Sequence, residues 1–91
     1  MADVIVELKV MPASVETDLN ALKNDAEKMI KEFGADLGKV EETPIAFGLK
    51  ALMLTIVFDE AKGSTDDLEE KIASLDSVES CNVTRVSRAL G

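Results

Sequence analysis

Carboxylates are the most abundant side chains in this sequence that could do chemistry, and no histidine accompanies them. General acid–base catalysis uses histidine most often, and a cysteine nucleophile needs a neighbouring base. Cys81 is the only cysteine, and its place in an apolar strand pattern fits a small core residue. Glu41 and Glu42 are adjacent on an expected strand, so they point to opposite faces and form a poor acid–base pair. We therefore predict that the chain is not an enzyme.

Metal, cofactor and phosphate sites are not indicated either. Zinc-type sites need histidines or paired cysteines, and the chain has neither. Loops that cradle phosphates are rich in glycine, whereas the five glycines here are scattered. Asp66 and Asp67 occur where a helix is expected to begin, and acidic groups are favoured there. We predict no metal, no cofactor and no nucleotide bound by the chain itself.

An apolar turn is the first feature that suggests a binding function. Residues 44–50 read PIAFGLK in an otherwise charged chain. Turns are usually polar and exposed, so an aromatic residue such as Phe47 at a hairpin tip often anchors a partner protein. The alternative is that Phe47 folds back over the edge of the core, and the spacing alone does not decide between the two.

Two arginines near the C-terminus are the second such feature. Arg85 and Arg88 end a chain that has 18 acidic and 10 basic residues, a net charge of −8. They could meet an anionic site on a partner, or they could simply keep the surface soluble.

The overall charge limits the classes of partner. Nucleic acids and anionic membranes are bound by clusters of Lys and Arg, which this acidic chain lacks, so we expect neither as a direct partner. A basic protein partner is compatible with the charge. One cysteine excludes a disulfide-stapled secreted domain, the start of the chain lacks a basic signal segment, and no apolar run approaches a membrane span. We expect a cytoplasmic protein whose 91 residues form a single domain.

The first half of the chain predicts a strand, a helix and a weaker strand. Residues 3–11 alternate between apolar and polar, which is typical of a strand with one buried face, and Pro12 ends it. Thr17 or Asp18 can cap a helix that closes at Gly34. Its buried stripe is Leu19, Leu22, Ala26, Ile30 and Phe33. Residues 36–46 contain Pro44, so we expect an edge strand or one that breaks at the proline.

The second half predicts a strong strand, a helix and a final strand. Phe47-Gly48 is a plausible hairpin turn before residues 49–58. In that strand Leu52, Leu54, Ile56 and Phe58 are expected to face the core, and Ala51, Met53, Thr55 and Val57 the opposite side. Ser64 or Thr65 caps a second helix with the stripe Leu68, Ile72 and Leu75. Residues 78–87 form the last strand, where Cys81 and Val83 fit one inward register and Val86 fits the other, so the strand can contain a bulge.

The element order is therefore β-α-β-β-α-β. Two helices with one apolar stripe each can cover only one face of a four-stranded sheet. This predicts an α+β, ferredoxin-like sandwich with an antiparallel sheet and both helices on one face.

Several segments resemble a known family, the archaeal elongation factor 1-beta proteins and the C-terminal exchange domain of their eukaryotic counterparts. The resemblance covers the whole chain, and the stretch from Pro44 to Leu52, PIAFGLKAL, is its most specific part. The other segments are VELKVMP at 6–12, DL at 18–19, DDLE at 66–69, VES at 78–80 and RAL at 88–90.

The resemblance implies that residues 1–91 are a single guanine-nucleotide exchange domain of the ferredoxin-like fold. It implies insertion of one end of the domain between domains of the GTPase elongation factor 1-alpha. Phe47 would contact the second domain of that partner, with Pro44, Ile45, Gly48 and Lys50 beside it. Arg88, where the eukaryotic domain has a lysine, would reach the Mg²⁺ and phosphate region; Arg85 is the alternative for this role.

Two other readings use the same fold. A small-molecule-binding regulatory module would usually place glycine-rich turns at a subunit interface, and no two of the five glycines are clustered. An RNA-binding sandwich needs basic and aromatic residues on its open sheet face. The residues expected there are Ile5, Glu7, Lys9, Ala51, Met53, Thr55 and Val57, which argues against RNA.

Overall fold

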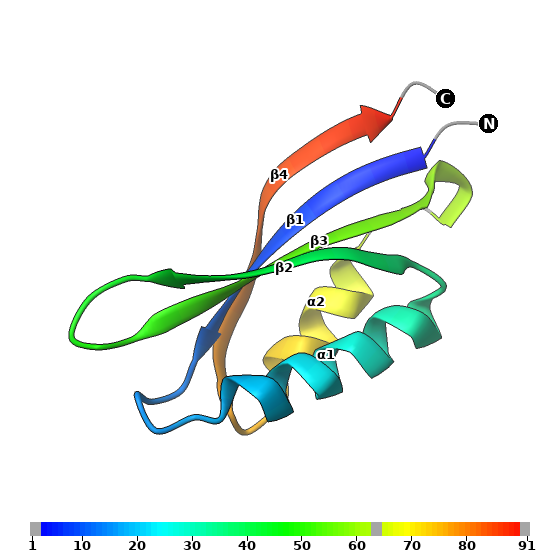
Figure 1. Cartoon of the computed structure of the whole chain (residues 1–91). Helices are drawn as coiled ribbons and strands as arrows, with labels where there is room; N and C mark the ends of the chain where they lie inside the picture. Colours follow the sequence, from blue (N-terminus) through cyan, green and yellow to red (C-terminus); the bar gives the residue numbers. More distant parts are fainter. Residues whose placement is uncertain (1–2, 63–64, 90–91) are drawn as a thin grey trace.

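The computed structural model describes residues 3–62 and 65–89. The elements are β1 (Asp3–Pro12), α1 (Leu19–Phe33), β2 (Asp36–Pro44), β3 (Lys50–Asp59), a 3-10 turn (Glu60–Lys62), α2 (Asp66–Ala73) and β4 (Val78–Ala89). The strands form one antiparallel sheet in the order β2-β3-β1-β4, and both helices lie on the same side of it (Figure 1). The predicted α+β, ferredoxin-like sandwich is confirmed.

The core lies between the sheet and the helices and is almost entirely aliphatic. The one pair of contacting aromatic rings among the described residues is Phe33 and Phe58, whose centroids are 5.5 Å apart in an edge-to-face arrangement. The inward residues of β1 alternate with outward ones along most of the strand, as a half-buried sheet requires. The fully buried side chains include Leu8, Val10, Leu22, Ile30, Leu52, Leu54, Ile56, Leu68 and Ile72.

Helix α1 begins and ends as its sequence predicts. The Asp18 carboxylate accepts hydrogen bonds from the backbone N–H groups of Asn20 at 3.0 Å and Ala21 at 3.3 Å. These bonds satisfy two donors that have no partner inside the helix. Gly34 takes the left-handed conformation, with φ at 97°, and closes the helix.

Three local expectations need correction. Strand β2 is an edge strand that ends at Pro44, which confirms the expectation drawn from the proline, and only the outer bound of 46 is wrong. Thr65 is the residue before α2, but its side chain makes no capping hydrogen bond, because its own backbone is not extended (φ −89°, ψ 7°). Ser64, the other candidate, lies outside the described residues. Ala51 was expected on the exposed side and is fully buried; its methyl group is small enough to be covered by its neighbours.

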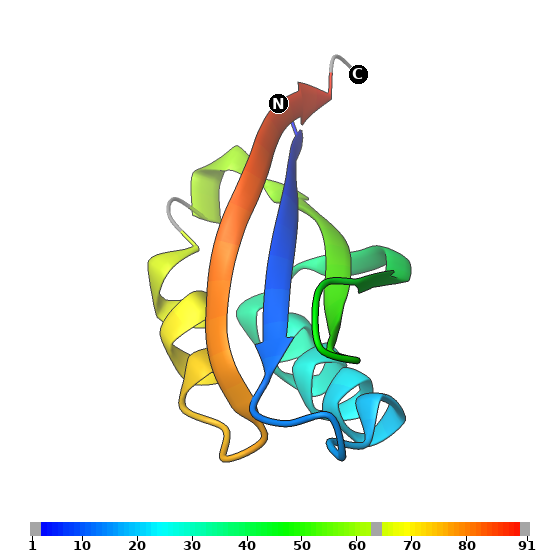
Figure 2. The ribbon, with the colours of Figure 1, turned by 90° about the vertical axis from the view of Figure 1, so that its left-hand side faces the viewer.

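The bulge expected in the last strand is present at Thr84. Glu7 of β1 pairs with Arg85 and Leu8 pairs with Val83, so Thr84 has no residue opposite it. The Thr84 hydroxyl donates to the Glu7 side chain at 2.9 Å. The bulge is thus fastened to the neighbouring strand, and Figure 2 shows the two strands side by side along the sheet.

The bulge changes which side chains of β4 share a face. Val86 lies opposite the buried Val6, on the helix side of the sheet together with Cys81. Strict alternation would have placed Val86 on the open face. It is nevertheless 63% exposed, because β4 extends past both helices at this end (Figure 1).

Candidate functional site

The connection between β2 and β3 contains a tight turn whose first central residue is unusual. The N–H of Leu49 donates to the carbonyl of Ala46 at 2.9 Å, and the N–H of Ile45 donates to the carbonyl of Leu49 at 2.8 Å. Between them Phe47 has φ at 54° and Gly48 has φ at 79°. Positive φ at both central residues matches the twist of antiparallel strands, but Asn or Gly is the usual first residue. Phe47-Gly48 is therefore confirmed as the turn.

Phe47 occupies a strained backbone conformation and points into solvent. A bulky residue with positive φ is uncommon and costs roughly 1–3 kcal/mol. Its side chain is 96% exposed, so no packing in the free protein offsets this cost. The structure thus decides the question that spacing left open: Phe47 does not fold back over the core. Strain and exposure together at one aromatic residue are typical of a binding site.

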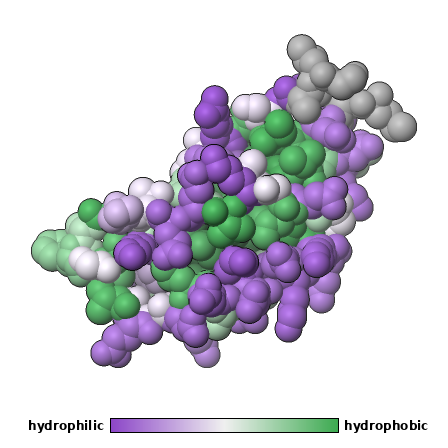
Figure 3. Space-filling view, viewed as in Figure 1, coloured by the Kyte–Doolittle hydropathy of each residue, from purple (hydrophilic) through white to green (hydrophobic). Residues whose placement is uncertain are grey.

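The neighbours of Phe47 make the hairpin tip an apolar surface. Pro44, Ile45, Gly48 and Lys50, the other residues predicted to contact a partner, all belong to the hairpin. Ile45 is 41% exposed, which is high for its size. Apolar side chains cover the left-hand end of the molecule in Figure 3, where the hairpin lies among charged groups.

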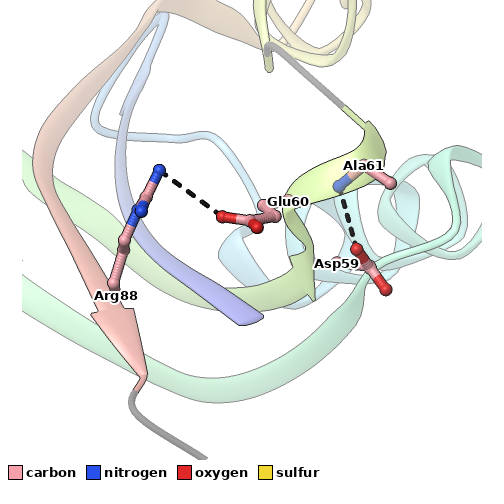
Figure 4. Close-up of polar contacts among 4 residues, drawn as sticks. All are labelled: Asp59, Glu60, Ala61 and Arg88. Carbon is pink, nitrogen blue, oxygen red and sulfur yellow. Dashed lines mark hydrogen bonds and ion pairs between the residues drawn. The ribbon is translucent and has the colours of Figure 1, made fainter. Parts of the chain in front are cut away.

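Arg88 lies at the other end of the sheet, beside the turn that follows β3. The guanidinium of Arg88 forms an ion pair with the Glu60 carboxylate at 3.4 Å (Figure 4). The Asp59 side chain accepts a hydrogen bond from the N–H of Ala61 at 2.9 Å and thereby holds the turn that carries Glu60. The Arg88 side chain is 71% exposed, so this pair holds it weakly and leaves most of its donors available.

The two candidate arginines lie on opposite faces of the sheet, because they are three positions apart in a regularly paired stretch of β4. Arg88 pairs with Val4, a residue packed against the core, and so lies on the helix side. Arg85 pairs with Glu7 and lines a hollow on the open face. The phosphate region of a partner could therefore contact Arg85 or Arg88, but not both at once.

The structure does not bring Phe47 and Arg88 together. Arg88 pairs with Val4, which pairs with Phe58, whereas Phe47 lies just beyond Lys50 at the start of the same strand. Eight residue steps along β3 correspond to about 26 Å. The molecule is 42 Å long, and the hairpin and the end of β4 lie at its opposite ends (Figure 1). The two sites can therefore contact only separate parts of a partner.

Sequence reasoning missed two residues next to these sites. Glu60 contacts Arg88 only because β1 brings the ends of β3 and β4 together, and no local pattern indicates this. Val15, in the loop between β1 and α1, is 61% exposed and lies against the hairpin at Gly48. An isolated apolar residue in a loop was its only signal.

The buried thiol of Cys81 is not poised for catalysis. Burial, with a smaller contribution from the charge of Glu69, raises the pKa of Cys81 to about 12. The thiolate, which is the reactive form, is therefore scarce at neutral pH. Across residues 3–62 and 65–89 no three acidic or cysteine side chains gather as a metal site would require. Neither helix in the described part of the chain is long and apolar enough to cross a bilayer.

Comparison with known proteins identifies relatives along almost the whole sequence. Residues 5–89 match the family model of the EF-1 guanine nucleotide exchange domain. Elongation factor 1-beta of Methanothermobacter thermautotrophicus is 42% identical over 90 residues, which cover 99% of this chain and 100% of that protein. Elongation factor 1-beta of Methanosphaera stadtmanae is 46% identical with the same two coverages.

Comparison with solved structures supports the fold and nothing more specific. The de novo designed protein Foldit4 is 19% identical, has a TM-score of 0.62, and covers 98% of each chain. At this identity the likeness concerns only the arrangement of helices and strands. Because a designed protein has the same arrangement, the arrangement by itself does not indicate a function. The fold therefore does not favour a small-molecule-binding regulatory module.

Proposed function

Because the chain belongs to the family of EF-1 guanine nucleotide exchange domains and has the role of a translation elongation factor of the exchange type, we propose that it binds elongation factor 1-alpha and accelerates the release of its GDP. The match over residues 5–89 is the observation that carries this proposal. Its place of action would be the cytoplasm, where translation occurs.

Exchange of this kind requires binding, not an enzymatic active site. A GTPase holds its nucleotide through Mg²⁺ and through backbone amides around the phosphates. A protein that binds the nucleotide-free form tightly must weaken nucleotide binding by the same factor, because the two equilibria are linked. The factor speeds exchange in both directions, and the excess of GTP over GDP decides the outcome. The factor itself binds neither nucleotide.

In this mechanism Phe47 supplies binding energy away from the nucleotide. Its exposure at the tip of a rigid hairpin supports a contact with the second domain of elongation factor 1-alpha. Pro44, Ile45, Gly48 and Lys50 would surround that contact. An aromatic anchor of this type typically contributes about 2 kcal/mol or more to a complex.

Arg88 would act at the other end by carrying positive charge to the Mg²⁺ and phosphate region. A cation near the Mg²⁺ position competes with the metal and disturbs its ligands. Exposure of the guanidinium supports this role, and a separation of more than about 26 Å along the sheet fits a partner that is contacted on two domains at once. Arg85 remains the alternative, although its position on the open face would require a different approach of the partner.

The direct test is release of fluorescent GDP from the cognate elongation factor 1-alpha in excess GTP. Addition of this protein should raise the release rate in proportion to its concentration until the GTPase is saturated. A release rate that stays at its intrinsic value, with complex formation also absent in a pull-down, would refute the proposal. Calorimetry of the protein alone with GDP or GTP should show no heat of binding.

A further inference from the structure

Exposed apolar residues are concentrated at the hairpin end of the molecule. Four large hydrophobic residues are exposed within residues 3–62 and 65–89, namely Val15, Ile45, Phe47 and Val86. The first three lie at the same end, where the β1–α1 loop and the hairpin meet (Figure 1). Grouped apolar side chains on a surface usually mark a contact with another molecule.

Val15 is held in its outward position by hydrogen bonds on both sides. The N–H of Thr17 donates to the carbonyl of Ser14 at 3.2 Å, and the N–H of Ala13 donates to the carbonyl of Ser77 at 2.8 Å. A Cβ atom placed on Gly48 would lie 3.7 Å from a methyl carbon of Val15, so the loop touches the hairpin tip. The β1–α1 loop and the hairpin therefore form one continuous surface.

A hollow of about 460 Å³ lies between the loop and the base of the hairpin. Its charged residues are Asp18, Glu42 and Lys50, so two carboxylates face one ammonium group. Only one oxygen of Asp18 is used by the helix cap. Val15 and Gly48 supply part of its lining next to Phe47. Such a hollow suits a side chain with an apolar stem and a positive end.

We propose that this hollow receives a lysine or arginine side chain of elongation factor 1-alpha, with Val15 as a second apolar anchor beside Phe47. The inference rests on the proposed function, because continuity with the Phe47 surface is what identifies the occupant. A second copy of this chain is a poor occupant. Each copy carries a net charge of −8, so two copies repel each other electrostatically.

Strand β2 offers a matched pair of substitutions for the test. Glu42 pairs with the core residue Leu52 and lies on the helix side, at the hollow, whereas Glu41 pairs with Met53 and lies on the open face. Glu42→Lys and Glu41→Lys change the net charge equally, so they alter long-range attraction to the partner by the same amount. Only Glu42→Lys places a positive charge in the hollow.

Affinity for nucleotide-free elongation factor 1-alpha is measured for both variants and for Val15→Lys. Glu42→Lys and Val15→Lys should each weaken binding about tenfold or more, and Glu41→Lys by less than about twofold. All three should unfold within a few degrees of the wild type, because the replaced side chains are exposed.

The outcomes separate the two proposals. Equal affinities for Glu41→Lys and Glu42→Lys, in a wild type that exchanges GDP normally, would overturn the hollow and leave the exchange function intact. A wild type that neither binds the GTPase nor speeds GDP release would remove both. Sedimentation tests the remaining occupant: a wild-type dimer that Val15→Lys converts to a monomer, with GTPase affinity unchanged, would assign the surface to a second copy and overturn the inference.

Discussion

Replacement of Phe47 by asparagine should make the free protein more stable and its complex less stable. Phe47 has φ at 54°, a conformation that asparagine tolerates much better than a bulky residue does. The turn would keep its two backbone hydrogen bonds, since neither involves the side chain. The substitution therefore removes strain and aromatic surface at once, and the two effects act on different equilibria.

The gain in stability follows from the exposure of the ring. With 96% of Phe47 exposed, on the order of 10 Å² of an aromatic residue of roughly 200 Å² is buried, which is worth about 0.2 kcal/mol. Relief of the left-handed conformation is worth about 1 kcal/mol. The difference is a net gain of nearly 1 kcal/mol, or about 4 °C or more in the unfolding midpoint of a domain this size.

The loss in the complex is larger and has the opposite sign. Removal of an aromatic anchor should cost about 2 kcal/mol of binding free energy, which is roughly 30-fold in Kd. Thermal unfolding followed by circular dichroism measures the first effect, and titration against nucleotide-free elongation factor 1-alpha measures the second. Phe47→Tyr is the control, because it keeps the ring and should change neither quantity much.

Either measurement can refute this reasoning. A lower unfolding midpoint for Phe47→Asn would mean that the ring stabilises the free protein in spite of its exposure. An unchanged Kd would mean that Phe47 does not anchor the partner, and the reason for a strained aromatic at the hairpin tip would have to be sought elsewhere.

Further substitutions test the other features. In GDP-release assays Arg88→Lys should keep most activity, Arg88→Ala should lose much of it and Arg88→Glu nearly all; an Arg88→Glu variant as fast as the wild type would eliminate the charge mechanism. Glu60→Ala should alter release by no more than about fivefold, as expected for an exposed ion pair, and should have no effect in an Arg88→Ala background. Gly34→Ala should lower stability by about 1–2 kcal/mol in urea unfolding, because φ is 97° and the added methyl would displace the ammonium group of Lys62; Gly34→Asn should cost less, and equal costs would refute the conformational explanation. Since burial raises the pKa of Cys81 to about 12, the unfolded chain loses the thiol proton first as pH rises above its usual value near 9, so stability should fall from about pH 9 upward; a Cys81→Ala variant with the same decline would assign it to other groups.

Periodicity was enough to predict the elements that carry one buried stripe. The alternation in β1 and the helical spacing of Leu22, Ala26 and Ile30 are local patterns, so they can be read from short stretches of the sequence. The ends of α1 were predictable for the same reason, since Asp18 and Gly34 act on their immediate neighbours. The bulge could be inferred from two conflicting alternations, although its position at Thr84 could not.

Features that depend on tertiary contacts were beyond the sequence. The direction of Phe47 follows from the φ values of the turn, and Phe-Gly is not among the usual pairs for this geometry. The contact between Arg88 and Glu60 requires the register of three strands together with the bulge. Burial of Ala51 depends on side chains around it, which alternation does not describe. The candidate residues could thus be named from resemblance, but their exposure and contacts could not.

The irregularities of β4 and β2 also bear on how the protein behaves when many copies are crowded together. Both strands lie at the borders of the sheet, where unpaired backbone groups could recruit a strand from another molecule. The extra residue at Thr84 interrupts the regular spacing of these groups along one border, and Pro44 with the charged Lys39 and Glu41 interrupts the other. A translation factor with such borders is protected against edge-to-edge pairing of its sheet with the sheets of other copies.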